Sequence, residues 1–216
     1  MNIAKGSKSW VLIPFIACIF FLVLFMFFIR EVIGAIFLFI SIVLFIKTIV
    51  LILFFRDPER NIGKGIVASA DGRIREISNL KDDDVGDCTR ISTFMNIYNV
   101  HVNRMPLGGT IKNIVHNKGF HLPAFKKESE KNERVTITIS TKIGIIKVIQ
   151  IAGTLARRIT PYIQKGDKLK KGEKIGIIRF GSRVDVYLPN KSIKFIKVKI
   201  GEMVKAGECT IAEIND

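Results

Sequence analysis

The sequence predicts a mainly β domain that follows an α-helical hairpin long enough to enter a membrane. Two long apolar runs with few charges lie within residues 1–55. From residue 56 onward, short β-branched runs alternate with glycines, and one glycine-containing turn sequence occurs twice. These three observations divide the 216 residues into a membrane-anchoring hairpin, 1–55, and one β domain, 56–216.

The two apolar runs have the length and composition of membrane helices. Residues 10–29 carry no charge, and residues 32–55 carry one, Lys47. About twenty apolar residues cross the hydrocarbon core of a bilayer, and neither run has the polar face of a surface helix. Arg30 and Glu31 mark the turn between them. The sequence therefore predicts either two membrane spans or one re-entrant helical hairpin.

Basic residues on both flanks predict the orientation of this hairpin. Lys5 and Lys8 precede the first apolar run, and Arg56, Arg60 and Lys64 follow the second. Basic flanks tend to stay on the cytoplasmic side of a membrane. We therefore expect the β domain at the cytoplasmic face of the cell (inner) membrane.

The overall charge indicates which partners the β domain has. The net charge is +15, and residues 1–55 hold four of the 34 basic and one of the 19 acidic residues, which leaves +12 for the β domain. A basic domain beside a membrane is attracted to anionic head groups. The absence of a nucleic-acid-binding motif argues against nucleic acid as a partner. Cys18, Cys88 and Cys209 are too widely spaced for a disulfide framework or a metal site, so no metal is expected.

Short apolar runs predict the elements of the β domain. β-branched residues favour strands over 135–140, 143–151 and 174–179. The stretch 92–99 predicts a short helix, and the polar stretch 116–134 predicts a loop. No long amphipathic helix is expected in this domain.

One turn sequence occurs twice in the β domain. Residues 166–173 and 201–208 share a glycine, an acid, an apolar residue and a final Gly-Glu, and a strand-like run follows each copy. This pattern resembles the two half-motifs of biotinyl/lipoyl-type β-barrels, so the predicted fold is a barrel-sandwich hybrid. Gly181 and Ser182 lie between the copies, where carrier domains of that type present a modified lysine. A serine at this place argues against a carrier function.

Four ordered segments carry a resemblance to a known family. They are Ala70-Asp71-Gly72, Asn99-Val100-His101-Val102-Asn103-Arg104-Met105-Pro106, Ile151-Ala152-Gly153-Thr154-Leu155-Ala156-Arg157-Arg158-Ile159, and Phe180-Gly181-Ser182-Arg183-Val184-Asp185-Val186. Together they resemble the motif series of the phosphatidylserine decarboxylase proenzyme in its short, single-domain form. The resemblance covers the chain from about residue 56 to its end.

The resemblance implies a self-processing decarboxylase that makes its own cofactor. Ser182 would attack the Gly181 carbonyl, and the chain would split into a β chain, 1–181, and an α chain, 182–216, which remain together as a heterodimer. Ser182 would become a pyruvoyl group, which forms a Schiff base with the amine of the substrate and accepts the electrons released with carbon dioxide. Phosphatidylserine would thereby become phosphatidylethanolamine, with neither metal nor pyridoxal phosphate. The resemblance also implies further dimerisation of the processed enzyme.

Two polar residues are the candidates for acid–base work in this site. His101 is the candidate base for the Ser182 hydroxyl, with Asp71 to orient its ring. The longer bacterial form of the family has two histidines in this motif, and Arg104 stands at the second. Two alternatives therefore stay open: His101 serves both cleavage and proton delivery, or Asp71 acts more directly on Ser182.

Arginines are the candidates for substrate binding. Arg183, Arg157 and Arg158 suit a phosphate through their two-pronged donor geometry. His116 and His121 are expected to be surface residues. Two other functions remain alternatives to the lipid decarboxylase. One is a non-catalytic, membrane-anchored barrel such as an adaptor, and the other is a pyruvoyl decarboxylase for a soluble amino acid.

Overall fold

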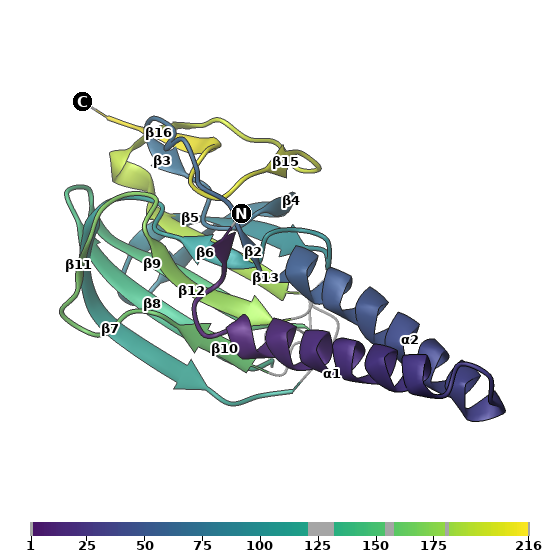
Figure 1. Ribbon diagram of the computed structural model, residues 1–216. Helices are drawn as coiled ribbons and strands as arrows, with labels where there is room; N and C mark the ends of the chain where they lie inside the picture. The colour runs from purple at the N-terminus through teal and green to yellow at the C-terminus, as the bar shows by residue number, and fades with distance from the viewer. Residues whose placement is uncertain (1, 121–131, 154–157, 180–181, 216) are drawn as a thin grey trace. The chain divides into compact units, whose positions relative to one another are not determined.

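The chain forms two compact units, Met1–Pro58 and Glu59–Asp216 (Figure 1). They are seen in a computed structural model of the protein. The structure describes the chain in four ranges, 2–120, 132–153, 158–179 and 182–215. Gly181, Arg157 and His121 lie outside the described residues.

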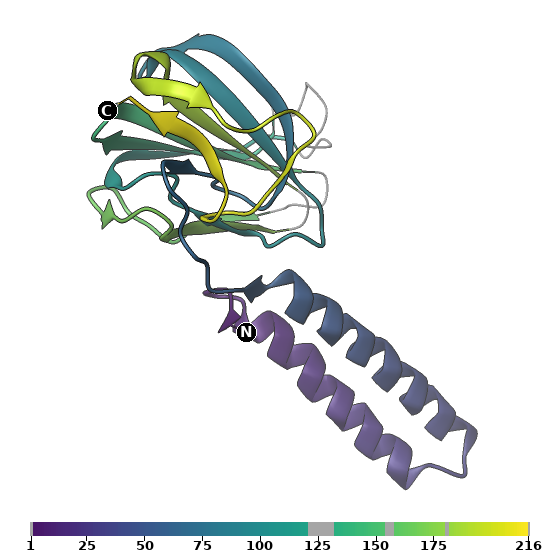
Figure 2. The same ribbon diagram turned by 90° about the horizontal axis from the view of Figure 1, so that it is seen from above.

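The first unit is an α-helical hairpin. Helices α1 (Lys8–Phe27) and α2 (Val32–Phe54) run side by side in opposite directions (Figures 1 and 2). The Ser41 hydroxyl joins them by donating to the Cys18 carbonyl oxygen at 3.0 Å. Strand β1 (Asn2–Ile3) pairs with β2 (Arg56–Asp57), so the two ends of the hairpin are held together.

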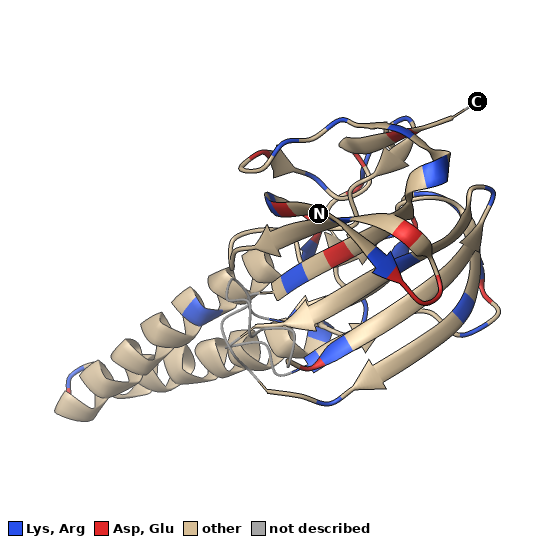
Figure 3. Ribbon diagram, turned by 180° about the vertical axis from the view of Figure 1, so that it is seen from behind, with Lys and Arg blue, Asp and Glu red and all other residues tan. Residues whose placement is uncertain are grey.

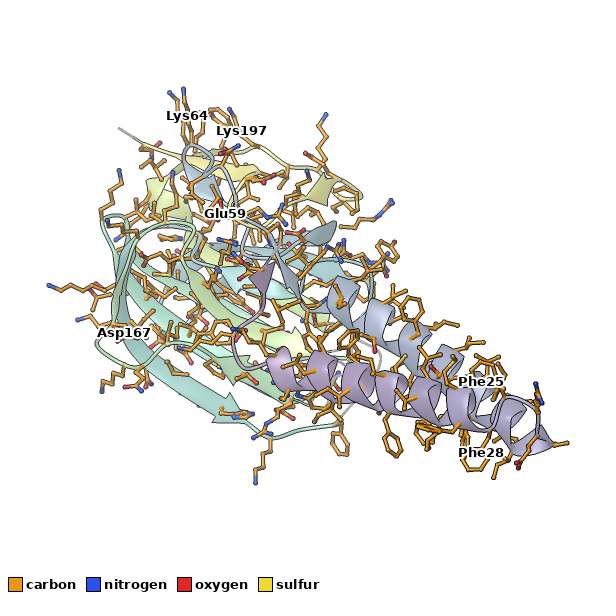
Figure 4. All side chains as sticks on the ribbon, viewed as in Figure 1. Phe25, Phe28, Glu59, Lys64, Asp167 and Lys197 are labelled. Atoms are coloured by element: carbon orange, nitrogen blue, oxygen red, sulfur yellow. The ribbon has the colours of Figure 1, made fainter. Side chains whose placement is uncertain are left out.

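The surface of the hairpin is apolar. Phe27 and Phe39 are 78% and 67% exposed, and Phe25 and Phe28 lie near the loop that joins the helices (Figure 4). Figure 3 shows how few charges the helices carry in comparison with the strands. Both helices are long and apolar enough to cross a membrane. The predicted helical hairpin is confirmed, and its composition is compatible with membrane association.

The second unit is built on one curled antiparallel sheet of eight strands (Figures 1 and 2). The order of its strands is β11-β7-β8-β9-β13-β5-β4-β15. Their bounds are β4 Gly72–Asp82, β5 Gly86–Met95, β7 Gly109–Asn117, β8 Arg134–Thr141, β9 Gly144–Ala152, β11 Lys168–Leu169, β13 Ser182–Pro189 and β15 Met203–Val204. This architecture confirms the predicted mainly β class.

Two three-stranded sheets complete the unit. One has the order β10-β12-β6 and the other β14-β16-β3. Their bounds are β3 Ile66–Val67, β6 Val102–Arg104, β10 Arg158–Pro161, β12 Lys174–Arg179, β14 Ile193–Ile196 and β16 Thr210–Ile214, with a 3₁₀ turn, η2, at Asn190–Ser192. Isoleucine and valine side chains from all three sheets form one core.

Alternation along β13 separates core from outer face. Val184, Val186 and Leu188 belong to the core, and Ser182 shares their side because side chains alternate along a strand. Arg183 and Asp185 therefore lie on the opposite face of the sheet.

The repeated turn sequence forms two equivalent turns. Gly166 and Gly201, which begin the two copies, have φ angles of 96° and 91°, which favour glycine. Their amides donate to equivalent carbonyl oxygens, those of Ile111 at 2.9 Å and Ile74 at 2.8 Å. The second glycine of each copy, Gly172 or Gly207, repeats this geometry with φ of 83° or 78°. The internal repeat thus gives the β domain two structurally similar halves.

Most predicted strands are confirmed, and one predicted helix is wrong. The strand predictions over 135–140, 143–151 and 174–179 match β8, β9 and β12. The helix expected over 92–99 is instead the end of β5 followed by a turn. Its first residues pair with β4 on one side and with β13, which is distant in sequence, on the other, and this pairing overrides the local preference. The first residues of the loop predicted over 116–134 belong to β7, and its last residue belongs to β8.

Candidate active site

Ser182 begins β13 in the middle of the large sheet. It pairs with Met95 of β5 on one side and with Ala152 of β9 on the other. Its side chain is fully buried, and its hydroxyl donates to the Met95 sulfur at 3.2 Å. A thioether is a weak acceptor, so the hydroxyl is held loosely in a protected place.

The Ser182–Met95 pair occupies the position that a tight hairpin turn has in the other half of the domain. Met203 and Lys168, the third residues of the two repeated turns, pair with Arg73 and Thr110. On the adjacent strands, Arg73 pairs with Phe94, which in turn pairs with Arg183. In the other half, Thr110 pairs with Ser140, which in turn pairs with Ile145. One step further are Ser182–Met95 in one half and Gly144–Thr141 in the other. Thr141 and Gly144 are joined by a two-residue turn, whereas 86 residues separate Met95 from Ser182.

Two buried amides lie beside Met95. The Asn103 side-chain nitrogen donates to the Met95 sulfur at 3.7 Å, and the Gln150 side-chain nitrogen donates to the Asn103 side-chain oxygen at 2.7 Å. Asn103 and Gln150 are both fully buried. Sequence reasoning did not single out Met95, Asn103 or Gln150, although Asn103 lies within the His101 motif. Asn103 and Gln150 thus form a buried amide pair that contacts the sulfur to which the Ser182 hydroxyl donates.

His101 is fully buried just before β6. Its Nδ1 lies 2.8 Å from the Asn99 carbonyl oxygen. Because a carbonyl only accepts, this bond assigns the ring proton to Nδ1 and leaves the basic lone pair of the neutral ring on Nε2. The His101 carbonyl oxygen accepts from the Ile178 amide at 3.4 Å. Ile178 lies on β12, four residues before Ser182, so the backbone brings His101 to the Ser182 end of the domain.

Asp71 is fixed by charge and by backbone. Its Oδ2 lies 2.8 Å from Arg60 Nη2, and its Oδ1 accepts from the Ala206 amide at 2.7 Å. Arg60 also pairs with Glu208 at 3.3 Å. Asp71 precedes β4, whose residue Arg73 pairs with Phe94, the neighbour of Met95. The fold therefore places Asp71 and Ser182 at the same end of the sheet, on strands separated by β5.

Arg183 lies on the face opposite Ser182. Its Nη2 is 2.9 Å from Asp185 Oδ2, and both residues are buried. Burial raises the pKa of the Asp185 carboxyl, and the Arg183 guanidinium opposes that rise. The ion pair gives Arg183 a structural partner on the outer face of the sheet.

Arg158 faces a second arginine that sequence reasoning missed. It begins β10 and pairs in register with Arg179, the last residue of β12. Arg158 is exposed and Arg179 half-buried. Burial lowers the pKa of Arg179, and the charge of Arg158 lowers it further. Two like charges opposite each other destabilise a sheet, and Arg179 is three residues from Ser182.

Other candidate residues have separate surroundings. Arg104 is buried, and its Nη1 donates to the Gly172 carbonyl oxygen at 3.0 Å. His116 lies 2.9 Å from Glu133, a partner that the sequence did not reveal, and its side chain is half exposed. Within the described ranges, no group of three or more His, Cys, Asp or Glu side chains has the arrangement of a metal site.

Comparison with known proteins identifies the family. The family described as phosphatidylserine decarboxylase matches residues 48–212, a span that includes Asp71, His101 and Ser182. The chain belongs to the phosphatidylserine decarboxylase family. The Streptomyces coelicolor phosphatidylserine decarboxylase proenzyme is 50% identical over 155 residues, which cover 71% of this chain and 68% of that one.

Other relatives are named as archaetidylserine decarboxylase proenzymes, and one of them matches almost the whole decarboxylase chain. A Methanosarcina mazei protein, provisionally named an archaetidylserine decarboxylase proenzyme, is 41% identical over 218 residues, which cover 99% of this chain and 98% of the relative. One of the same name from Methanococcoides burtonii is 46% identical over 169 residues, or 77% of this chain and 76% of the relative. The predicted family and decarboxylase activity are therefore confirmed.

Proposed function

We propose that the protein converts phosphatidylserine to phosphatidylethanolamine and carbon dioxide with a pyruvoyl group made from Ser182. The observation that carries this proposal is the buried Ser182 at the first position of β13, in a half of the barrel whose hairpin is open at that point. Cleavage of the peptide bond before Ser182 therefore leaves every residue of β13 in the sheet. The family match across this region supports the same reading.

Self-cleavage would proceed from the Ser182 hydroxyl. Its oxygen attacks the Gly181 carbonyl and gives an ester, and elimination then frees the Gly181 carboxylate and leaves a dehydroalanine. Hydrolysis of that residue releases ammonia and leaves the pyruvoyl group. The weak bond to the Met95 sulfur lets the hydroxyl turn away from its present partner at little cost.

The two chains produced by cleavage would remain associated. The α chain, 182–216, contains β13 to β16. Strands β13, β15 and β16 pair with β9, β5, β4 and β3 of the β chain, 1–181. Val184, Val186 and Leu188 also stay in the shared core. The register therefore supports a β/α heterodimer that survives cleavage.

When formed, the pyruvoyl group supplies the electrophilic carbonyl that holds the substrate amine and takes up the electrons released with carbon dioxide. It would replace a hydroxyl that now donates to a thioether in a buried place, so the position accommodates an uncharged carbonyl. His101, with its basic nitrogen at Nε2, is the residue that we assign to proton transfer. Asp71, held by Arg60 and Ala206, provides a fixed negative charge for the cleavage step.

The phosphodiester of the lipid needs a cationic partner. Arg158 and Arg179 face each other on adjacent strands, and an anion between them would relieve their mutual repulsion. Arg157 precedes this pair in sequence and remains a further candidate. Arg183, bound to Asp185 on the other face, fits a structural role better.

The hairpin would anchor the enzyme in the cell membrane. Its two apolar helices and the basic residues Lys5, Lys8 and Arg56 at its ends support placement of the β domain at the cytoplasmic face. Such an anchor keeps a lipid-consuming enzyme at the surface that holds its substrate.

Archaetidylserine is a second candidate substrate. The relatives that match nearly the whole chain, hairpin included, are named for it. Both lipids carry a phosphoserine head group and differ in their hydrocarbon part, so the same polar residues would serve either.

Reconstitution of the full chain into vesicles tests the proposed function. We expect carboxyl-labelled phosphatidylserine to release labelled carbon dioxide and to yield the ethanolamine lipid, and Ser182→Ala to release none. Archaetidylserine in equal amount measures the preference between the lipids. Release from free serine but not from lipid would favour a soluble amino-acid decarboxylase. A processed protein that releases carbon dioxide from none of these would contradict the proposal.

A further inference from the structure

The turn over residues 96–99 exposes two large side chains beside the candidate active site. Ile97 is 59% exposed and Tyr98 66% exposed. The turn follows Met95, which contacts the Ser182 hydroxyl, and precedes His101 by one residue, Val100. A tight turn on the surface of a soluble domain usually carries polar residues, and large apolar side chains are seldom exposed there.

This turn is firmly held despite its exposure. The Asn99 amide donates to the Asn96 carbonyl oxygen at 3.0 Å, and the Asn96 amide donates to the Asn99 side-chain oxygen at 2.8 Å. The Asn96 side-chain nitrogen donates to the Tyr98 hydroxyl at 2.7 Å. Ile97 and Tyr98 are therefore presented outward by a preformed turn, which lowers the entropy lost on binding.

Further exposed apolar side chains lie at the same end of the large sheet. Phe120, 66% exposed, follows the end of β7, and Met203, 49% exposed, pairs with Arg73 at the start of β4. The register places both at the end of the sheet that holds Ser182, with the start of β4 next to β5 and the end of β7 separated from β13 by β8 and β9. These exposed apolar side chains thus lie at the Ser182 end of the large sheet, toward both of its edges.

Exposed basic residues accompany these apolar side chains. Arg73 and Arg75 lie at the start of β4, and Lys118 follows β7. The Arg75 guanidinium lies 6.0 Å from the ring centre of Phe94, the residue before Met95. Aromatic and aliphatic side chains within a basic surround are the combination that suits the head-group region of an anionic bilayer.

We propose that the 96–99 turn inserts Ile97 and Tyr98 into the interface of an anionic bilayer and thereby brings the Ser182 end of the domain to the lipid head groups. The occupant is a bilayer rather than a protein because the exposed basic residues match anionic head groups, and because Tyr98 is an interfacial residue type with a polar tip. The inference rests on the proposed function only in that the substrate is a lipid.

The same turn also contacts His101. The Asn99 carbonyl oxygen that fixes His101 Nδ1 belongs to the same turn. The turn proposed to meet the lipid therefore also carries the carbonyl that sets the tautomer of the candidate base.

Fluorescence of a tryptophan placed in the turn tests the insertion directly. Trp10 is the only tryptophan of the chain, so the background is Trp10→Phe in the full chain reconstituted into vesicles of phosphatidylcholine and phosphatidylserine. Tyr98→Trp reports the turn, and Ile145→Trp reports an exposed position at the other end of the sheet. We expect brominated lipids to quench the first and not the second. Equal quenching of both, or of neither, would overturn the proposal.

This readout does not depend on the decarboxylase activity, so a chain that lacks the activity can still support or overturn the insertion. A second measurement compares Ile97→Ser/Tyr98→Ser with Ile145→Ser in processed enzyme. We expect the double variant to lose about tenfold in rate on serine lipid in bilayers, from lost apolar burial, and to keep its rate on a short-chain serine lipid dissolved as monomers. Equal loss on both substrates would assign the turn to His101 positioning alone and overturn docking.

Discussion

The two halves of the β domain have the same scaffold but different residues at equivalent places. In each half, a glycine turn hydrogen-bonds to the start of a long strand. Gly72 pairs with Val204, and Gly109 pairs with Leu169 at the equivalent position. The residue before this glycine is Asp71 in one half and Gly108 in the other. One half thus carries a buried carboxylate where the other has no side chain.

The halves also differ in how two central strands are connected. β8 and β9 are joined by a tight turn, whereas the equivalent β5 and β13 are separated by the whole of the other half. Ser182 and His101 lie at this opening. The repeat therefore accounts for the fold, and the departures from the repeat account for the proposed chemistry.

The largest expected effect is that of Ser182→Ala. Without a hydroxyl to attack Gly181, the chain should stay in one piece and show no decarboxylation. The core should be preserved because Ser182 is replaced by a smaller residue at the end of a strand. Denaturing electrophoresis over several days measures the split. A variant that still divides at this position would exclude cleavage by Ser182.

His101→Ala should lower the turnover of processed enzyme by about 100-fold or more, the contribution typical of a positioned acid or base. Single-turnover assays on enzyme that has already been processed separate this effect from cleavage. If cleavage slows as well, His101 serves both steps. Unchanged turnover in processed His101→Ala enzyme would remove it from proton transfer.

Asp71→Asn should slow self-cleavage about tenfold or more, since it removes a fixed charge at the Ser182 end of the sheet. The matched control is Gly108→Asp in the other half. A side chain added at Gly108 would meet the Lys171 amide at 3.5 Å, an ordinary contact, where Asp71 accepts from the equivalent Ala206 amide. We expect the control to fold and to cleave normally. Equal rates for both variants would mean that the asymmetry between the halves has no chemical consequence.

Arg179→Gln should raise the apparent KM for serine lipid about tenfold with a smaller change in kcat, because a charged hydrogen bond to phosphate is lost. Arg179→Lys should restore part of the affinity. Lys174→Gln, at the other end of β12, is the control for a general loss of positive charge. The assignment would fail if the control raised KM as much as Arg179→Gln does.

Asp82→Asn should lower the free energy of unfolding by about 1 kcal/mol and leave cleavage unchanged. Lys147 Nζ lies 2.7 Å from Asp82 Oδ1 at the end of β4 remote from Ser182. Burial alone would raise the pKa of Asp82, but hydrogen bonds from Lys147 and two backbone amides outweigh it and lower the pKa below its usual 3.8. The contribution is therefore present above pH 3.8 and is lost as the pH falls through the lowered pKa. Urea unfolding should show a larger difference between wild type and variant at pH 7 than at pH 3.

Local patterns predicted the helices, the repeated turns and most strands, but they could not predict which side chains meet. Ser182 contacts Met95, which is 87 positions earlier in the chain, and Asn103 contacts Gln150 across 47 positions. Such contacts depend on strand register, which no single segment encodes. The same limit applies to Arg183, whose place next to Ser182 in sequence puts it on the opposite face of the strand. Arg179 became a candidate for phosphate binding only because it pairs in register with Arg158.

The intact mass of the purified protein under denaturing conditions tests the central claim most directly. The account predicts two chains divided between Gly181 and Ser182, with an α chain that lacks the ammonia of its first residue and reacts with a carbonyl reagent. A single chain of 216 residues that persists for days and is inert to carbonyl reagents would contradict it. The opened hairpin would then be a feature of the fold without the proposed chemistry.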